Sequence, residues 1–99
     1  MHVISKSEFR NFSQKYQDAK KSLDSWHKVA KSSKWKHIDE VKASYSSADA
    51  VGKFTVFNIR GNNYRLITSI DYKKQIIYIK YVLTHSEYDS GFWKNDPYY

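Results

Sequence analysis

The sequence predicts an α+β fold in which two or three N-terminal helices pack on one face of a small, mainly antiparallel sheet of about four strands. Apolar residues recur at helical spacing in the first half of the chain. Runs rich in β-branched and aromatic residues fill the second half, and turn-forming residues separate these runs. The length of 99 residues has room for one domain, which we place at residues 1–99.

The composition excludes several classes of protein. Hydrophobic residues make up 40% of the chain and aromatic residues 17%, too much apolar surface for a disordered chain. Cysteine is absent and the four histidines are scattered, so we expect no disulfide, no metal and no other cofactor. The start turns polar after Ile4 and no apolar run approaches a membrane span, which predicts a cytoplasmic protein without membrane contact.

The charge balance favours a polyanionic partner. Seventeen Lys and Arg residues against ten Asp and Glu residues give a net charge of +7. A basic surface attracts nucleic acid, although a small domain can also be basic only for solubility. The arrangement of the cations therefore has to decide between the two.

The first half of the chain predicts one short strand and a helical hairpin. Val3 and Ile4 suit a strand, and the capping-box spacing of Ser5 and Glu8 starts a helix. A second helical pattern covers residues 19–31. The core-facing residues of the hairpin are Phe9, Phe12, Tyr16, Leu23, Trp26 and Ala30.

The next segment is rich in lysine and leads to the sheet. Residues 26–38 form either a phosphate-binding edge or a solvated turn with a buried tryptophan. Residues 38–45 suit a third helix, and residues 46–53 suit a loop. Three strands then follow as an antiparallel meander at residues 54–60, 64–71 and 76–83. The tail, residues 90–99, has no clear periodicity and is either mobile or an added edge strand.

Alternation along the strands sorts their side chains into two faces. One set is largely apolar and is predicted to face the helices: Phe57, Ile59, Tyr64, Leu66, Ile70, Ile77, Ile79, Tyr81 and Leu83. The opposite, open face then gathers Asn58, Arg60, Arg65, Tyr78 and Lys80. Three cations beside an aromatic ring and an amide suit a bent RNA backbone, and the alternative is an ordinary solvated face.

A histidine closes the last strand. Thr84 and Glu87 repeat the capping-box spacing, which places His85 in the first turn of a short helix. The positive end of the helix dipole favours a neutral imidazole that can accept a proton, and Tyr88 offers a neighbouring hydroxyl. The alternative is a structural histidine at a strand end.

Several segments together resemble the HigB family of type II toxins, within the RelE/ParE-like superfamily. The segments are Val56–Ile67, Tyr78–Lys80 and Thr84–Asp89, with Val3–Ser5, Trp26, Trp35 and Ala48–Val51 upstream. The resemblance covers nearly the whole chain up to Asp89, with a departure at Leu83 and in the tyrosine-rich tail.

The resemblance implies a RelE-like fold and the toxin component of a type II toxin-antitoxin system. Such toxins are mRNA interferases, endoribonucleases that usually cut mRNA while it is translated on the ribosome. A HigA-type antitoxin with a helix-turn-helix domain would neutralise the toxin, and operator DNA would be reached only through that antitoxin.

The family positions imply a set of site residues. They give Arg60, Arg65, Lys80, His85 and Tyr88 as catalytic candidates, with Asn58 and Asn62 as supporting RNA contacts, although Asn62 equally suits a turn. Tyr78 and Lys53 are further candidates for RNA binding. The hypothesis is metal-independent attack by an RNA 2′-hydroxyl, with His85 as first choice of base and Lys80 as second. Tyr88 or another cation would protonate the departing oxygen, while Arg60 and Arg65 stabilise charge on phosphorus.

Two other functions stay open on the sequence. The same fold serves ParE-like toxins that inhibit gyrase without cutting RNA. A basic module that binds RNA without chemistry is the third possibility, and it would leave RNA intact.

Overall fold

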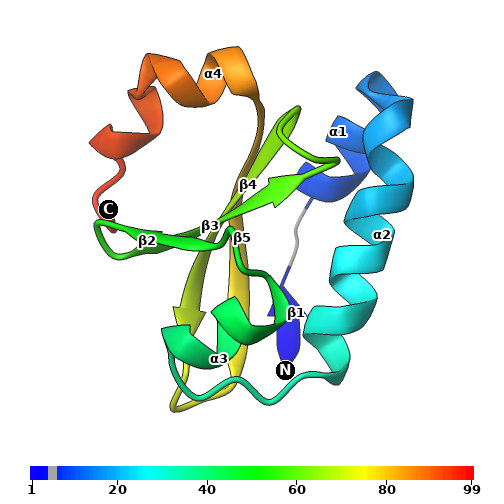
Figure 1. The fold of residues 1–99 in the computed structure, drawn as a ribbon. Coiled ribbons are helices and arrows are strands. Elements are labelled where there is room, and N and C mark those ends of the chain that lie inside the picture. The colour runs from blue at the N-terminus through cyan, green and yellow to red at the C-terminus, as the bar shows by residue number, and fades with distance from the viewer. Residues whose placement is uncertain (5–6) are drawn as a thin grey trace.

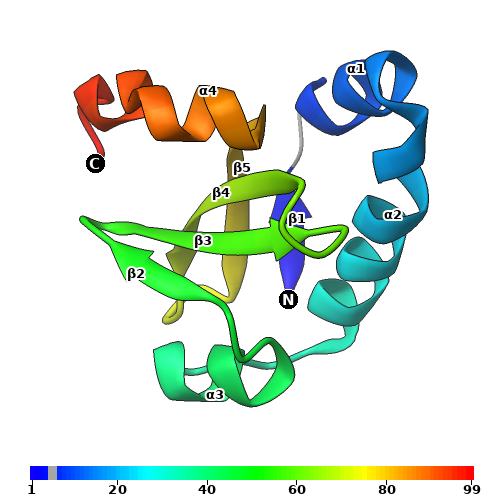
Figure 2. The same cartoon turned by 45° about the horizontal axis from the view of Figure 1, so that its top comes forward.

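The protein contains a five-stranded sheet with helices on both sides (Figure 1). The structure is a computed structural model that describes residues 1–4 and 7–99. The α+β prediction is confirmed. Helices α1 and α2 cover one side of the sheet, α3 lies at its lower end, and α4 with the C-terminal turn lies on the other side (Figures 1 and 2). Among the described helices, none is long and apolar enough to cross a membrane.

The predicted helices are confirmed with small shifts of their ends. They are α1 (Glu8–Lys15), α2 (Gln17–Ser32) and α3 (Ile38–Ser44). Ser7 takes the N-cap position of α1, while the predicted start at Ser5 lies outside the described residues. The first two helices fold back on each other, with the ring of Phe9 packed edge-on against Trp26 at 5.9 Å.

The sheet contains one strand more than the sequence indicated. The strands are β1 (His2–Ile4), β2 (Asp49–Val51), β3 (Phe54–Ile59), β4 (Tyr64–Asp71) and β5 (Ile76–Thr84), in the order β1-β5-β4-β3-β2. Among the strands that the structure describes, only β1 and β5 form a parallel pair. The predicted loop at residues 46–53 is wrong in part, because Gly52 at φ +60° closes a tight hairpin that pairs β2 with β3.

A bulge in β5 changes which residues face the helices. Ile79 pairs with Thr68 and Tyr81 pairs with Ile67, so Lys80 is an extra residue on this strand. The alternation therefore shifts by one position after Lys80. The prediction that Tyr81 and Leu83 share the face of Ile77 and Ile79 is wrong, because an extra residue reverses the direction of every side chain that follows it.

The opposite face of the sheet is covered rather than open. Helix α4 (His85–Ser90) and the 3₁₀ turn η1 (Phe92–Asn95) cross this face, and Trp93 is only 1% exposed. Its buried neighbours are Phe54, Val56, Ile67 and Leu83. The tail thus contains a helical turn and no strand, and burial of Trp93 explains why the predicted solvated face becomes a second core.

Candidate active site

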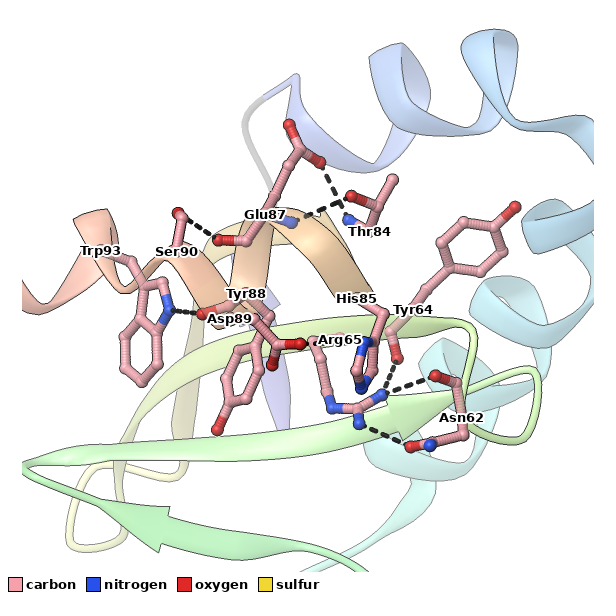
Figure 3. Close-up of polar contacts among 10 residues, drawn as sticks. All are labelled: Asn62, Tyr64, Arg65, Thr84, His85, Glu87, Tyr88, Asp89, Ser90 and Trp93. Carbon is pink, nitrogen blue, oxygen red and sulfur yellow. Dashed lines mark hydrogen bonds and ion pairs between the residues drawn. The ribbon is translucent and has the colours of Figure 1, made fainter.

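The start of α4 is fixed to the turn that joins β3 and β4. The backbone N–H of Glu87 donates to the Thr84 hydroxyl at 3.2 Å, and the Thr84 N–H donates to the Glu87 carboxylate at 2.9 Å. This confirms the predicted capping box. Figure 3 shows this cap beside His85. The His85 N–H donates to the carbonyl of Asn63 at 3.1 Å, so the histidine has a defined place at this end of the sheet.

His85 is exposed and paired with a carboxylate. Its Nδ1 lies 3.1 Å from Oδ2 of Asp89, one helical turn later, and its side chain is 48% exposed. A carboxylate on Nδ1 orients an imidazole and leaves Nε2 as the atom that can take a proton from a substrate. The prediction missed Asp89, although its spacing of four residues from His85 on a short helix is the signal that could have found it.

Arg65 lies beside the histidine with its guanidinium held in place. The side chain is 8% exposed. Its Nη1 donates to the carbonyls of Asn62 at 3.0 Å and Tyr64 at 3.1 Å, and its Nη2 donates to Oδ1 of Asn62 at 2.5 Å. Figure 3 shows Arg65, His85 and Asn62 gathered at the same end of the sheet. A cation with this many fixed bonds needs little reorganisation to stabilise an anion.

The ring of Tyr88 lies beside Arg65. The guanidinium carbon of Arg65 lies 5.3 Å from the centre of the Tyr88 ring, and that ring stacks on Trp93 at 5.0 Å. Burial raises the pKa of Tyr88, and the nearby Arg65 only partly opposes this. The phenol is therefore protonated at neutral pH and can act as a proton donor.

Arg60 does not join this group. Strand β3 ends at Ile59, and Arg60 adopts a left-handed conformation at φ +50° in the following turn. Its Nη1 lies 3.1 Å from Oδ2 of Asp18 on α2, and Oδ1 of the same carboxylate accepts the Tyr64 hydroxyl at 2.6 Å. The prediction that Arg60 shares a face with Arg65 is wrong, because the left-handed turn ends the alternation of the strand.

Lys80 also lies apart from Arg65. Its Nζ lies 3.5 Å from Oδ2 of Asp96 and 4.8 Å from the centre of the Tyr98 ring. A chain of ring contacts, here called the aromatic chain, runs through Tyr88, Trp93, Tyr99 and Phe54 with successive centroids 5.0, 5.6 and 6.1 Å apart. Arg65 lies over the first ring and Lys80 over the last. Arg65 and Lys80 thus lie on the same face of the sheet as predicted, over different rings, and only Arg60 leaves the predicted group of three cations.

The residues predicted to bind RNA lie at several places along the sheet. Asn58 pairs with Arg65 across β3 and β4, so it lies next to the site. Asn62 is part of the site through its bonds to Arg65. Tyr78 is 39% exposed on β5, and Lys53 is exposed in the turn between β2 and β3.

We expect Asp96→Asn to destabilise the protein, because Asp96 holds the C-terminal end in place. Its carboxylate accepts the Tyr81 hydroxyl at 2.9 Å and the Tyr98 N–H at 2.8 Å. Hydrogen bonds to a charged group contribute about 1.5–3 kcal/mol, so a loss of roughly this size should appear in urea unfolding at pH 7. Asp24→Asn is the matched control, since it breaks only an exposed ion pair with Lys20.

This difference should depend on pH. The Tyr98 N–H is the main cause that lowers the pKa of Asp96 below the ordinary 3.8. A carboxyl with a lowered pKa stabilises the folded state above pH 3.8, and this contribution is lost as the pH falls through the folded value. If wild type and Asp96→Asn differ as much at acid pH as at pH 7, the charge of Asp96 is not the cause.

Comparison with known proteins identifies the family. The family model of the HigB toxin, the RelE-like toxic component of a toxin-antitoxin system, matches residues 19–91. The chain belongs to the HigB toxin family. The match spans α2 to α4 and therefore includes Arg65, His85 and Asp89.

Several HigB proteins are similar to this HigB-family chain over most of its length. The mRNA interferase HigB of Escherichia coli O6:H1 is 29% identical over 92 residues, which cover 90% of this chain and 89% of the relative. The mRNA interferase toxin HigB of Escherichia coli K12 is 30% identical over 92 residues, with 90% and 88% covered. The mRNA interferase HigB of Shigella flexneri shows the same identity and coverage.

Proposed function

We propose that this HigB-family chain is an mRNA interferase, an endoribonuclease that cuts translated mRNA on the ribosome. The names of its relatives support RNA cleavage. The observation that carries the proposal is the exposed imidazole of His85, oriented by Asp89 beside the fixed guanidinium of Arg65. This arrangement combines a proton acceptor with a preorganised positive charge, as cleavage at a phosphodiester requires.

The proposed reaction is an in-line displacement at phosphorus. His85 Nε2 takes the proton of the RNA 2′-hydroxyl, and the 2′-oxygen forms a bond to the adjacent phosphorus. Arg65 stabilises the additional negative charge on the phosphoryl oxygens. The bond to the 5′-oxygen breaks as the Tyr88 hydroxyl protonates that oxygen, which yields a 2′,3′-cyclic phosphate and a 5′-hydroxyl end. The net change is a transfer of the phosphoryl group that consumes no water and no co-reactant.

The other candidate residues take supporting roles in this proposal. Arg60, exposed at the rim, and Lys80, at the far end of the aromatic chain, would contact phosphates that flank the cleaved one. Lys80 is the weaker candidate for a base, because its Nζ lies at Asp96 and over the Phe54 ring, whereas Arg65 lies over the Tyr88 ring. Asn58, Asn62, Tyr78 and Lys53 would bind RNA around the centre.

The proposal includes a partner. A HigA-type antitoxin with a helix-turn-helix domain would neutralise the toxin, and operator DNA would be contacted only through the antitoxin. Membership of a family of toxic components supports an antitoxin partner.

RNA end mapping tests the proposed function. We expect purified protein to cut a reporter mRNA inside its reading frame in a reconstituted translation reaction and to leave 5′-hydroxyl ends, with cleavage retained after chelation of free zinc. The same mRNA without ribosomes tests the ribosome requirement. Intact mRNA together with DNA broken at gyrase sites would overturn the proposal in favour of a ParE-like toxin. If the protein binds RNA in a salt-sensitive way and the RNA stays uncut, the proposal would be overturned in favour of a module that only binds RNA.

A further inference from the structure

A shallow, widely open depression of about 570 Å³, here called the groove, adjoins His85 at the end of the sheet. Three separate parts of the chain contribute its lining, which consists of Tyr16, Asn62, Asn63, Tyr64, Thr84, His85 and Ser86. Tyr16 joins α1 to α2, whereas the asparagines belong to the turn between β3 and β4. A substrate phosphate at His85 would place a neighbouring nucleotide at this groove.

The lining differs in charge from the surroundings. Among the described residues that line the groove, none is a carboxylate, lysine or arginine. Cations stand near the lining instead: Nζ of Lys15 lies over the Tyr16 ring at 5.5 Å from its centre, and Arg60 precedes Asn62 by two residues. A neutral groove with cations near its lining suits a nucleobase inside and backbone phosphates outside.

Tyr16 is held in a fixed position in the wall of the groove. Its N–H donates to the carbonyl of Phe12 at 2.8 Å, and its own carbonyl accepts from Ala19 at 3.0 Å, which fixes the junction of the two helices. Its ring centre lies 4.7 Å from Phe12 and 5.6 Å from Tyr64. Tyr64 is itself anchored through Asp18. An aromatic ring that is packed from behind loses little freedom when a base stacks on it.

Polar groups next to Tyr16 could contact the edge of a base. Both backbone polar groups of Asn63 are hydrogen-bonded. Its N–H donates to the carbonyl of Arg60 at 3.3 Å, and its carbonyl accepts from the N–H of His85 at 3.1 Å. Within the described part of the chain, the side chains of Asn63 and Ser86 make no hydrogen bond. Carboxamide and hydroxyl groups in this state are ready to bond to a base.

We propose that this groove binds the nucleobase of a nucleotide that flanks the scissile phosphate, with the Tyr16 ring as the stacking surface. The proposal rests on the proposed RNA cleavage and adds its substrate subsite. Stacking accepts every base, so Tyr16 should contribute to affinity more than to sequence preference. Loss of one stacked base corresponds to roughly a 10- to 100-fold change in affinity.

Fluorescence of 2-aminopurine tests the subsite without requiring cleavage. The probes are short RNAs with a 2′-deoxy sugar at the nucleotide whose 2′-hydroxyl would attack, and with 2-aminopurine on either side of the scissile phosphate. We expect binding to quench one of the two probes with wild type and with Tyr16→Phe. Tyr16→Leu keeps an apolar side chain without a ring and should lose the quenching and bind roughly 10- to 100-fold more weakly.

The outcomes separate the subsite from the proposed function. Thermal unfolding of both variants establishes that each is folded before binding is compared. Quenching of neither probe by wild type, or equal quenching by Tyr16→Leu, would overturn the base subsite even if the protein cuts mRNA. Conversely, ring-dependent quenching by a protein that leaves mRNA intact would support the subsite and overturn the nuclease.

Discussion

Replacing His85 with alanine is expected to slow RNA cleavage by about 10²- to 10⁴-fold, the usual contribution of a positioned base. His85 is exposed at the first turn of α4, and its side chain takes no part in the cap formed by Thr84 and Glu87. The fold should therefore survive the change. Single-turnover cleavage of the reporter mRNA measures the rate, and relief of growth arrest gives a second readout in cells.

Two further variants define the role of the imidazole. His37→Ala is the matched control, because His37 is an exposed histidine near α3 that should not affect cleavage. Asp89→Asn keeps the size of the side chain while weakening its hold on Nδ1, so we expect a smaller loss that affects kcat more than KM. Full activity of folded His85→Ala would remove His85 from the mechanism.

Replacing Arg65 is expected to lower kcat by about 10²- to 10³-fold, comparable to the loss of one group that stabilises transition-state charge. The guanidinium is already bonded to Asn62 and Tyr64, so its position does not depend on the substrate. A lysine at this position keeps one positive charge but lacks the planar fork that reaches several acceptors. We therefore expect both Arg65→Ala and Arg65→Lys to lose activity in single-turnover assays.

Burial of Arg65 requires a stability control. Removing its donors leaves buried carbonyls without partners at a cost of about 1–3 kcal/mol, so unfolding in urea must accompany the kinetics. Arg10→Ala is the matched control, since Arg10 is exposed on α1. If folded Arg65→Lys cuts RNA at the wild-type rate, charge alone is sufficient and the fixed geometry is not required.

Local sequence patterns were sufficient for most elements of the fold. The β-branched and aromatic run at residues 64–71 matches β4, and the spacing of Thr84 and Glu87 predicted the start of α4. These features depend on residues close together in the chain, where propensity and capping act. The histidine of the candidate site was found for the same reason.

The arrangement of the cations could not be predicted in this way. The bulge at Lys80 is a property of pairing between β4 and β5, and the sequence of β5 alone does not show it. Likewise, the left-handed backbone of Arg60 depends on the turn that follows β3. A cover on the second face was missed because Trp93 belongs to a 3₁₀ turn, whose short length produces no periodicity.

The aromatic chain connects the candidate site to residues that are far from it in the sequence. Its rings come from β3, α4 and the last residues, and the ring of Tyr99 rests against Gly52 near the middle of the sequence. A Cβ added at Gly52 would meet the Tyr99 ring. The packing behind Tyr88 therefore extends to the hairpin of β2 and β3, so a substitution at that hairpin is expected to alter the position of the proposed proton donor.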